Sequence, residues 1–224
     1  MRLIVRFFDA CTNFLFPKTQ KILELEKLSS GEILRILPPA EEISDRNTIA
    51  LFDYGNPLVR EIIWSIKYRG DRQLANKIGE ILADVLEHEF AERELFEKFL
   101  DTESGKRPIL IPIPVSDKRR FERGWNQSEL IAQSVKKHIG ESLKYLPGQL
   151  VKHRHTESQT KTSSKGERLK NLNNSMHVTH PPTVAGRSVI LLDDVTTTGS
   201  TFAEAKRVLK DAGVKKIICL AIAH

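Results

Sequence analysis

The chain has 224 residues, enough for one sizeable α/β domain with an appendage. Hydrophobic residues make up 40% and charged residues 29%, an ordinary balance for a protein that builds a core, and the net charge of +6 suits phosphate-rich ligands or nucleic acid. No apolar run approaches the roughly 20 residues that a membrane span needs, and two cysteines without a CxxC pair support neither a disulfide framework nor a four-cysteine zinc site. We therefore expect a cytoplasmic protein without membrane insertion.

The first part of the chain reads as helical. Apolar residues at three-and-four spacing predict one or two helices between residues 2 and 37, the first of them a docking helix rather than a signal peptide. A short strand is predicted at Thr48–Tyr54, and Asn56-Pro57 is typical of a helix start. Lys67–Asp71 interrupts that helix, and a second helix is predicted from about Arg72 to Glu89.

The rest of the chain alternates short apolar runs with helical patterns. After a polar linker at Asp101–Arg107, strands are predicted at Ile109–Ile113, Gln149–Lys152, Met176–Val178 (an edge strand), Ser188–Leu192 and Lys216–Ala223, and helices at about Asn126–His138 and Thr201–Asp211. Alternation of strands and helices with short connections predicts an α/β fold with a parallel, doubly wound sheet.

One segment combines an acidic pair with a hydroxyl-rich loop. The apolar run Val189–Leu192 predicts a strand buried on both faces, and Asp193 and Asp194 stand at its carboxyl end, where open α/β sheets bind ligands. Hydroxyls and free amides before a helix make an anion cradle, here from Thr196, Thr197, Thr198, Gly199, Ser200 and Thr201. The carboxylates can accept hydrogen bonds from two sugar hydroxyls. One loop can thus hold a ribose 5-phosphate, whereas a simple helix cap explains only one hydroxyl residue.

A second loop carries concentrated positive charge. It follows the strand predicted at Ile109–Ile113 and contains Pro114, Val115, Ser116, Lys118, Arg119 and Arg123. Such a loop at the carboxyl end of a strand suits a pyrophosphate group, whose charge must be stabilised when it leaves. An exposed basic turn is the alternative, and the neighbouring phosphate loop favours the anion site.

The order of strand, acidic pair, short loop and Thr-Gly-Ser-Thr resembles the phosphoribosyl pyrophosphate signature of type I phosphoribosyltransferases. The resemblance implies that Asp193 and Asp194 contact the ribose 2′ and 3′ hydroxyls, that Thr197–Thr201 bind the 5′-phosphate, and that Mg²⁺ is held mainly by the substrate phosphates. Purine-salvage members carry a carboxylate in this loop where the chain has Thr197. We therefore do not expect a purine base activated by a loop aspartate.

The stretch Arg123–Leu130, RGWNQSEL, resembles the signature of the ComF family, competence-associated proteins of bacteria with a phosphoribosyltransferase-like fold. Two further stretches agree with that family. One runs from Tyr54 to Gly70 and implies a hood contributed by Lys67, Tyr68 and Arg69, and the other is a flexible loop with Arg154, Thr156 and Gln159. The four motifs occur in the family's order from Ile49 to His224, which makes the resemblance specific.

Members of that family typically open with a four-cysteine zinc finger near an aromatic-Pro segment. This chain has Phe14-Leu15-Phe16-Pro17 but not the cysteines, so we predict no zinc. Apolar spacing predicts an N-terminal helical region, which we place over residues 1–47, and the resemblance implies a phosphoribosyltransferase-like domain over residues 48–224. Within that domain the hood would span about 48–100 and the core about 101–224.

The apolar-poor segment His155–Gly166 is predicted to be a mobile loop. One interpretation is a lid that closes to exclude water from a reactive sugar cation, and the other is a disordered linker.

Three functions remain open from the sequence. The first is a glycosyltransferase that binds phosphoribosyl pyrophosphate with Mg²⁺ and transfers phosphoribose to an acceptor that the sequence does not identify. The second is a sensor of a phosphoribosyl ligand without turnover. The third is a cytoplasmic factor that handles single-stranded DNA with competence proteins, although a pure DNA binder has no need of Asp193 and Asp194 in an anion loop. A homodimer is compatible with all three.

Overall fold

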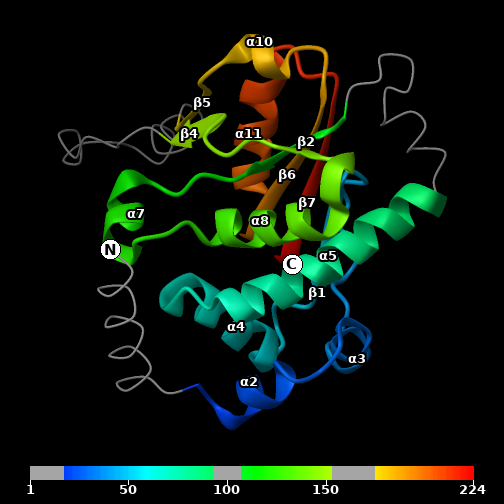
Figure 1. Ribbon diagram of the computed structural model, residues 1–224. Coiled ribbons are helices and arrows are strands. Elements are labelled where there is room, and N and C mark those ends of the chain that lie inside the picture. Colours follow the sequence, from blue (N-terminus) through cyan, green and yellow to red (C-terminus); the bar gives the residue numbers. More distant parts are fainter. Residues whose placement is uncertain (1–17, 93–106, 153–174) are drawn as a thin grey trace.

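The computed structural model describes residues 18–92, 107–152 and 175–224 (Figure 1). The docking helix predicted before Pro17, most of the linker at Asp101–Arg107 and the loop at His155–Gly166 lie outside these residues. None of the helices that the described ranges contain is both long and apolar enough to cross a membrane.

Within the described ranges, a five-stranded sheet has the order β1-β7-β6-β2-β3, and every neighbouring pair is parallel. The strands are β1 (Thr48–Phe52), β2 (Ile109–Pro112), β3 (Lys144–Tyr145), β6 (Ser188–Val195) and β7 (Lys216–Ala223). Two of the three inner strands, β6 and β7, contain the continuous apolar runs Val189–Leu192 and Ile217–Ala223, as expected of strands covered on both faces. The predicted parallel α/β sheet is confirmed.

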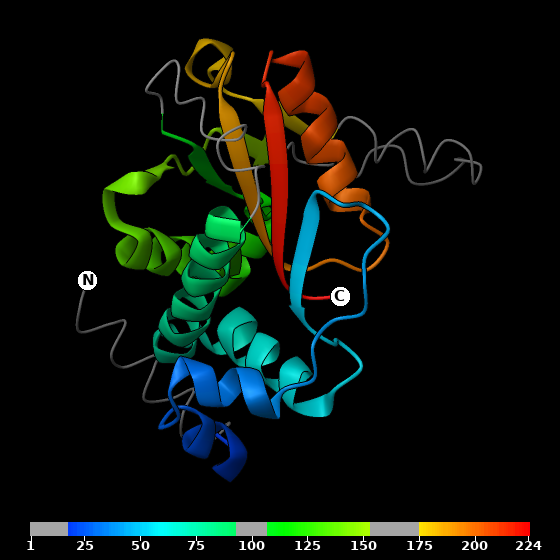
Figure 2. The same ribbon diagram turned by 90° about the vertical axis from the view of Figure 1, so that its right-hand side faces the viewer.

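Helices cover both faces of the sheet (Figure 2). The helices are α2 (Gln20–Leu25), α3 (Ser30–Ile36), α4 (Pro57–Trp64), the π-helix η1 (Ser65–Arg69), α5 (Arg72–Glu92), α7 (Asp117–Arg123), α8 (Gln127–Ile139), the 3₁₀ turn η2 (Gly140–Ser142), α10 (Pro181–Val184) and α11 (Ser200–Asp211). Successive residues of β6 point to opposite faces, so Ile190 belongs to the apolar core beneath α5 and α8, and Leu191 to the core beneath α11. This arrangement confirms the double winding.

Local signals explain the helix starts that the sequence predicts. Asn56 caps α4, because its side chain accepts hydrogen bonds from the amides of Leu58 and Val59, and Pro57 follows at the first helical position. The break predicted at Lys67–Asp71 takes the form of the π-helix η1, which ends at Gly70 in the left-handed conformation with φ of 64°. The chain therefore turns between α4 and α5 without a loop.

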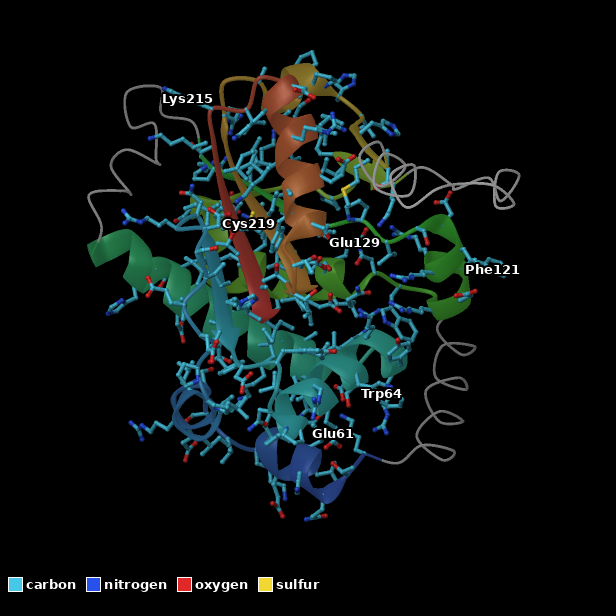
Figure 3. The ribbon with its side chains drawn as sticks, turned by 180° about the vertical axis from the view of Figure 1, so that it is seen from behind. Glu61, Trp64, Phe121, Glu129, Lys215 and Cys219 are labelled. Atoms are coloured by element: carbon cyan, nitrogen blue, oxygen red, sulfur yellow. The ribbon has the colours of Figure 1, made fainter. Side chains whose placement is uncertain are left out.

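The basic segment predicted as a loop is instead the helix α7. Ser116 caps it by accepting a hydrogen bond from the amide of Arg119, and Gly124 ends it with φ of 81°. None of its residues is buried, and Phe121 on its outer side is 93% exposed (Figure 3). The run of charged residues carries no apolar period, so the capping serine was the one signal for this helix.

The smaller strands also depart from the prediction. The strands β4 (Leu150–Lys152) and β5 (Met176–Val178) pair with each other, antiparallel, in a separate two-stranded sheet, so β5 is not an edge of the main sheet. The short β3, which was not predicted, forms that edge. The strand β1 pairs with β7 in the main sheet, although its residues fall in the range expected for the hood.

Candidate functional site

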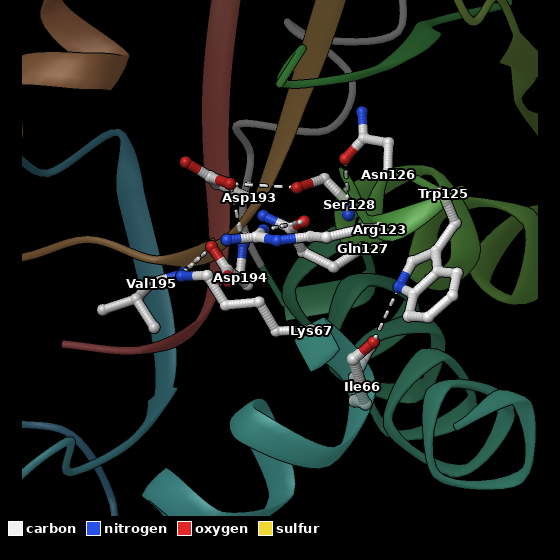
Figure 4. A network of polar contacts seen from close by, with 10 residues as sticks. All are labelled: Ile66, Lys67, Arg123, Trp125, Asn126, Gln127, Ser128, Asp193, Asp194 and Val195. Carbon is white, nitrogen blue, oxygen red and sulfur yellow. Dashed lines mark hydrogen bonds and ion pairs between the residues drawn. The ribbon is translucent and has the colours of Figure 1, made fainter. Parts of the chain in front are cut away.

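The acidic pair lies in the last part of β6, which continues past Leu192 to Val195. Asp193 is 8% exposed and Asp194 is 5% exposed, so both carboxyl groups are nearly withdrawn from water. They sit where β6 meets the start of α8 and the π-helix η1 (Figure 4). This is the carboxyl end of a central parallel strand, as the sequence predicts.

Protein donors hold one oxygen of each carboxyl group. Asp193 Oδ1 accepts hydrogen bonds from Ser128 Oγ and from the amide of Asp194, both at 2.9 Å. Asp194 Oδ1 accepts a hydrogen bond from the amide of Val195 at 3.0 Å. Asp194 Oδ2 lies 3.2 Å from Lys67 Nζ in an ion pair (Figure 4). The two side chains are therefore fixed in orientation, and Lys67 of the expected hood reaches the core at this point.

Burial and the adjacent Asp194 raise the pKa of the Asp193 carboxyl from its ordinary value to about 8. Burial disfavours the charged form, and a second carboxylate beside it acts in the same direction. The hydrogen bonds from Ser128 Oγ and the Asp194 amide oppose this rise without cancelling it. Near neutral pH the pair therefore carries a proton.

The signature segment after α7 connects three parts of the molecule. Trp125 Nε1 donates a hydrogen bond to the carbonyl of Ile66 in η1 at 3.2 Å, and Asn126 Nδ2 donates to the carbonyl of Ile113 after β2 at 3.0 Å. Asn126 also caps α8 through the amide of Ser128. The segment thus joins the hood, the start of the basic segment and the acidic pair. Ser128 belongs to the motif Arg123–Leu130, but the sequence analysis does not predict it as a site residue.

The hydroxyl-rich loop leads from β6 into α11. Thr196 is buried and donates its amide hydrogen to the carbonyl of Ala223, which anchors the loop to β7. Gly199 precedes α11 with φ of 69°, a conformation that residues with a side chain rarely adopt. Gly199 has no side chain to cap this helix start, and the amide of Ser200 donates a long hydrogen bond of 3.4 Å to Thr198 Oγ1. Thr197, Thr198 and Ser200 are exposed and Thr201 is half-buried, so most hydroxyls of the loop are accessible from solvent.

The residues predicted to bind pyrophosphate lie in two places, directly after β2 and on α7. Pro114, Val115 and Ser116 follow β2 directly beside the acidic strand, since the amide of Ile113 donates to the carbonyl of Leu192 at 2.8 Å. Lys118 and Arg119 are exposed on α7. Arg123 stacks over the ring of Tyr68 at 4.8 Å and donates a hydrogen bond to Gln127.

The hood residues form a row of rings and guanidinium groups. The rings of Trp64 and Tyr68 lie 5.6 Å apart, and Arg69 stacks over Trp64 at 4.9 Å. Trp64 is 41% exposed and Tyr68 47% exposed. With Arg123 these residues make one surface, which we call the aromatic–arginine row. The loop residues Arg154, Thr156 and Gln159 lie outside the described residues.

Sequence reasoning missed one lysine near the site. Burial and the nearby Arg119 lower the pKa of Lys152, while Asp193 and Glu204 act in the opposite direction. Lys152 ends β4, so its charge lies close to the acidic pair although it is distant in the sequence. A lone lysine in a short strand gives no motif, and only the tertiary structure could place it.

In the described part of the chain, no group of three or more His, Cys, Asp or Glu side chains could hold a metal ion. Two acidic side chains and a set of hydroxyls and amides fit a ligand that carries Mg²⁺ on its own phosphates. Mg²⁺ usually keeps several waters and takes few ligands from the protein.

Comparison with known proteins gives consistent matches. The Phosphoribosyl transferase domain family matches residues 126–224. Competence protein ComFC of Bacillus subtilis is 29% identical over 168 residues, which are 75% of this chain and 60% of that protein. DNA utilization protein YhgH of Escherichia coli O6:H1 is 28% identical over 195 residues, 86% of this chain and 77% of the relative.

A solved structure of glutamine phosphoribosylpyrophosphate (PRPP) amidotransferase from B. subtilis, complexed with ADP and GMP, aligns with a TM-score of 0.43 and 16% identity over 71% of this chain and 30% of its own length. The family match and the parallel sheet confirm the phosphoribosyltransferase-like α/β fold. The matched segment contains Ser128, the acidic pair and Thr196–Thr201, whereas Lys67 and α7 lie outside it.

Proposed function

We propose that the chain, which is similar to competence and DNA utilization proteins, is a member of the ComF family that binds phosphoribosyl pyrophosphate with Mg²⁺ in the cytoplasm and transfers phosphoribose to an acceptor, in a competence-related role. The observation that carries this proposal is the buried pair Asp193 and Asp194 at the end of β6, from which one short loop leads to the start of α11, where Gly199 offers no capping side chain. Carboxylate oxygens suit two sugar hydroxyls, and the helix start suits a phosphate. One ligand with both groups, a ribose 5-phosphate, fits both features.

In the proposed reaction, the bond between C1 of the ribose and the pyrophosphate oxygen breaks, and its electron pair leaves with the pyrophosphate. The acceptor then supplies the electron pair for the new bond to C1. Mg²⁺ held by the substrate would neutralise part of the leaving group's charge. The amides of the α11 start hold the 5′-phosphate, and Asp193 and Asp194 hold the sugar, so positioning and electrostatics supply the catalysis.

Calorimetric titration with phosphoribosyl pyrophosphate tests this proposal. We expect binding that strengthens with Mg²⁺, and a loss of roughly tenfold or more in affinity for the Asp193→Asn, Asp194→Asn double variant, because the variant loses the charged acceptor of the pair. Unchanged affinity in a folded double variant would refute the ribose assignment. Release of pyrophosphate with candidate acceptors then separates an enzyme from a sensor without turnover.

The aromatic–arginine row supports a second candidate function, the handling of single-stranded DNA. Exposed rings on which bases can stack, with positive charge nearby, are what sequence-tolerant single-strand binding requires. Fluorescence anisotropy with a labelled oligothymidine measures it. Replacement of Trp64 by alanine should weaken DNA binding without affecting phosphoribosyl pyrophosphate, and an equal affinity for DNA in the variant would rule out this surface.

A further inference from the structure

Asp194 Oδ2 has no hydrogen bond, although its partner oxygen does. Asp194 Oδ1 accepts from the amide of Val195. Asp194 Oδ2 is buried, and no donor among the described residues reaches it in hydrogen-bond alignment. Its neighbour is the ammonium of Lys67 at 3.2 Å, on a side chain that is 26% exposed. A buried carboxylate oxygen that lacks a hydrogen bond is unfavourable. This oxygen is therefore ready to accept one from a ligand.

The fold brings Lys67 to this place by a specific local structure. Lys67 lies in the π-helix η1, and such helices are rare and concentrated at functional sites. The hydrogen bond from Trp125 to Ile66 holds η1 against the core. The face of Trp125 also packs on Gly70, where an added Cβ would come within 2.9 Å of the ring. The lysine is therefore directed to Asp194 by backbone that the signature segment fixes.

We propose that Lys67 and Asp194 together recognise one hydroxyl of the ribose, which makes Lys67 a determinant of specificity for ribose over deoxyribose. This inference rests on the proposed phosphoribosyl site. The hydroxyl enters between the two charged groups, donates its hydrogen to Asp194 Oδ2 and accepts a hydrogen bond from Lys67 Nζ. A hydroxyl is both donor and acceptor, whereas ammonium only donates and carboxylate only accepts, so an inserted hydroxyl replaces the direct contact of 3.2 Å by two aligned hydrogen bonds.

A deoxy sugar presents a C–H group at this position and satisfies neither partner. A site built to hydrogen-bond a hydroxyl rejects analogues that lack it, because its own polar groups are left unpaired. The same argument excludes the deoxyribose of a DNA chain from this site. Any DNA handling by the protein would then use a different surface, such as the aromatic–arginine row.

The test compares three probes by calorimetry: D-ribose 5-phosphate and its 2-deoxy and 3-deoxy analogues. The wild-type protein should bind ribose 5-phosphate roughly tenfold to a hundredfold more tightly than at least one analogue. Lys67→Met should lose most of that preference, mainly through weaker binding of ribose 5-phosphate, and Lys67→Arg should keep part of it. Lys210→Met, an exposed lysine of α11, is the matched control and should behave as the wild type.

The outcomes separate this inference from the function on which it rests. If ribose 5-phosphate binds to the wild-type protein and Lys67→Met discriminates among the probes as the wild type does, the role of Lys67 is wrong and the phosphoribosyl site stands. If the wild-type protein binds none of the three probes, the phosphoribosyl site itself is wrong, and the inference falls with it. Thermal unfolding of each variant shows whether the fold is retained.

Discussion

Neighbouring aspartates at the end of β6 have different surroundings. Asp193 is held by the hydroxyl of Ser128 and the amide of Asp194, whereas Asp194 faces the ammonium of Lys67. Burial raises the pKa of Asp193 to about 8, so a ligand that supplies hydrogen-bond donors meets one neutral and one charge-paired carboxyl group. Two like charges therefore need not coexist before a ligand binds.

The raised pKa predicts a pH-dependent gain in stability for Asp193→Asn. The unfolded carboxyl loses its proton near its ordinary pKa of 3.8, and the folded one near 8. Between these two pKa values the folded state binds more protons, so wild-type stability falls as pH rises. Asn has no such proton, so the difference in Tm between variant and wild type should grow over this range and level off above it.

Thermal unfolding in a series of buffers measures this difference. Asp84→Asn, at an exposed position of α5, is the control and should give no trend. A difference for Asp193→Asn that is constant between about pH 4 and pH 8 would contradict the prediction.

At the scale of the elements, η1 and the signature segment depend on each other. The π-helix presents Lys67 to the acidic pair, and it ends at Gly70, whose φ of 64° suits glycine. The ring of Trp125 leaves no room for a side chain there, since a Cβ would lie 2.9 Å from it. The segments Lys67–Gly70 and Arg123–Gln127, well separated in the sequence, thus form the two sides of one contact.

Gly70→Ala should therefore be strongly destabilising. The left-handed conformation costs a residue with a side chain about 1–2 kcal/mol, and overpacking against Trp125 adds about 1–3 kcal/mol. The control is Gly31→Ala in α3, where no atom lies within 4 Å of an added Cβ. That variant should be stabilised by about 0.5–1 kcal/mol, because alanine favours the helix. Denaturant unfolding distinguishes the two, and equal effects would argue against the Trp125 contact.

For the whole molecule, the site depends on parts that are distant along the chain. Lys67 comes from the segment before α5, Ser128 from the start of α8 and the acidic pair from β6. A ligand that binds here contacts several elements that only the folded chain brings together. It therefore stabilises the whole described fold rather than one segment, since only the folded state has the site.

Phosphoribosyl pyrophosphate with Mg²⁺ should raise the Tm of the protein. At a ligand concentration of about 100 times Kd the stabilisation is about 2.7 kcal/mol, which for a domain of this size is a rise of roughly 5–10 °C. The Asp193→Asn, Asp194→Asn double variant should show a much smaller rise at the same concentration. Scanning fluorimetry measures both, and an equal rise in the two proteins would place the ligand elsewhere.

The sequence alone determined those elements of the protein that depend on residues close together in the chain. Apolar runs marked the central strands β2, β6 and β7, Asn56-Pro57 marked the start of α4, and the order of acidic pair and hydroxyl loop marked the cradle before α11. These features depend on residues near one another in the chain, so patterns of period and capping reveal them. The basic segment was the exception, because α7 carries no apolar period.

Only the tertiary structure decided which distant groups meet. Lys67 contacts Asp194, the charge of Lys152 acts on Asp193, Ser128 orients Asp193, and β1 joins the main sheet beside β7. Each of these depends on the packing of elements around a shared core, which no local pattern encodes. The same burial that brings them together raises the pKa of Asp193, because the carboxyl group loses water only when the chain folds.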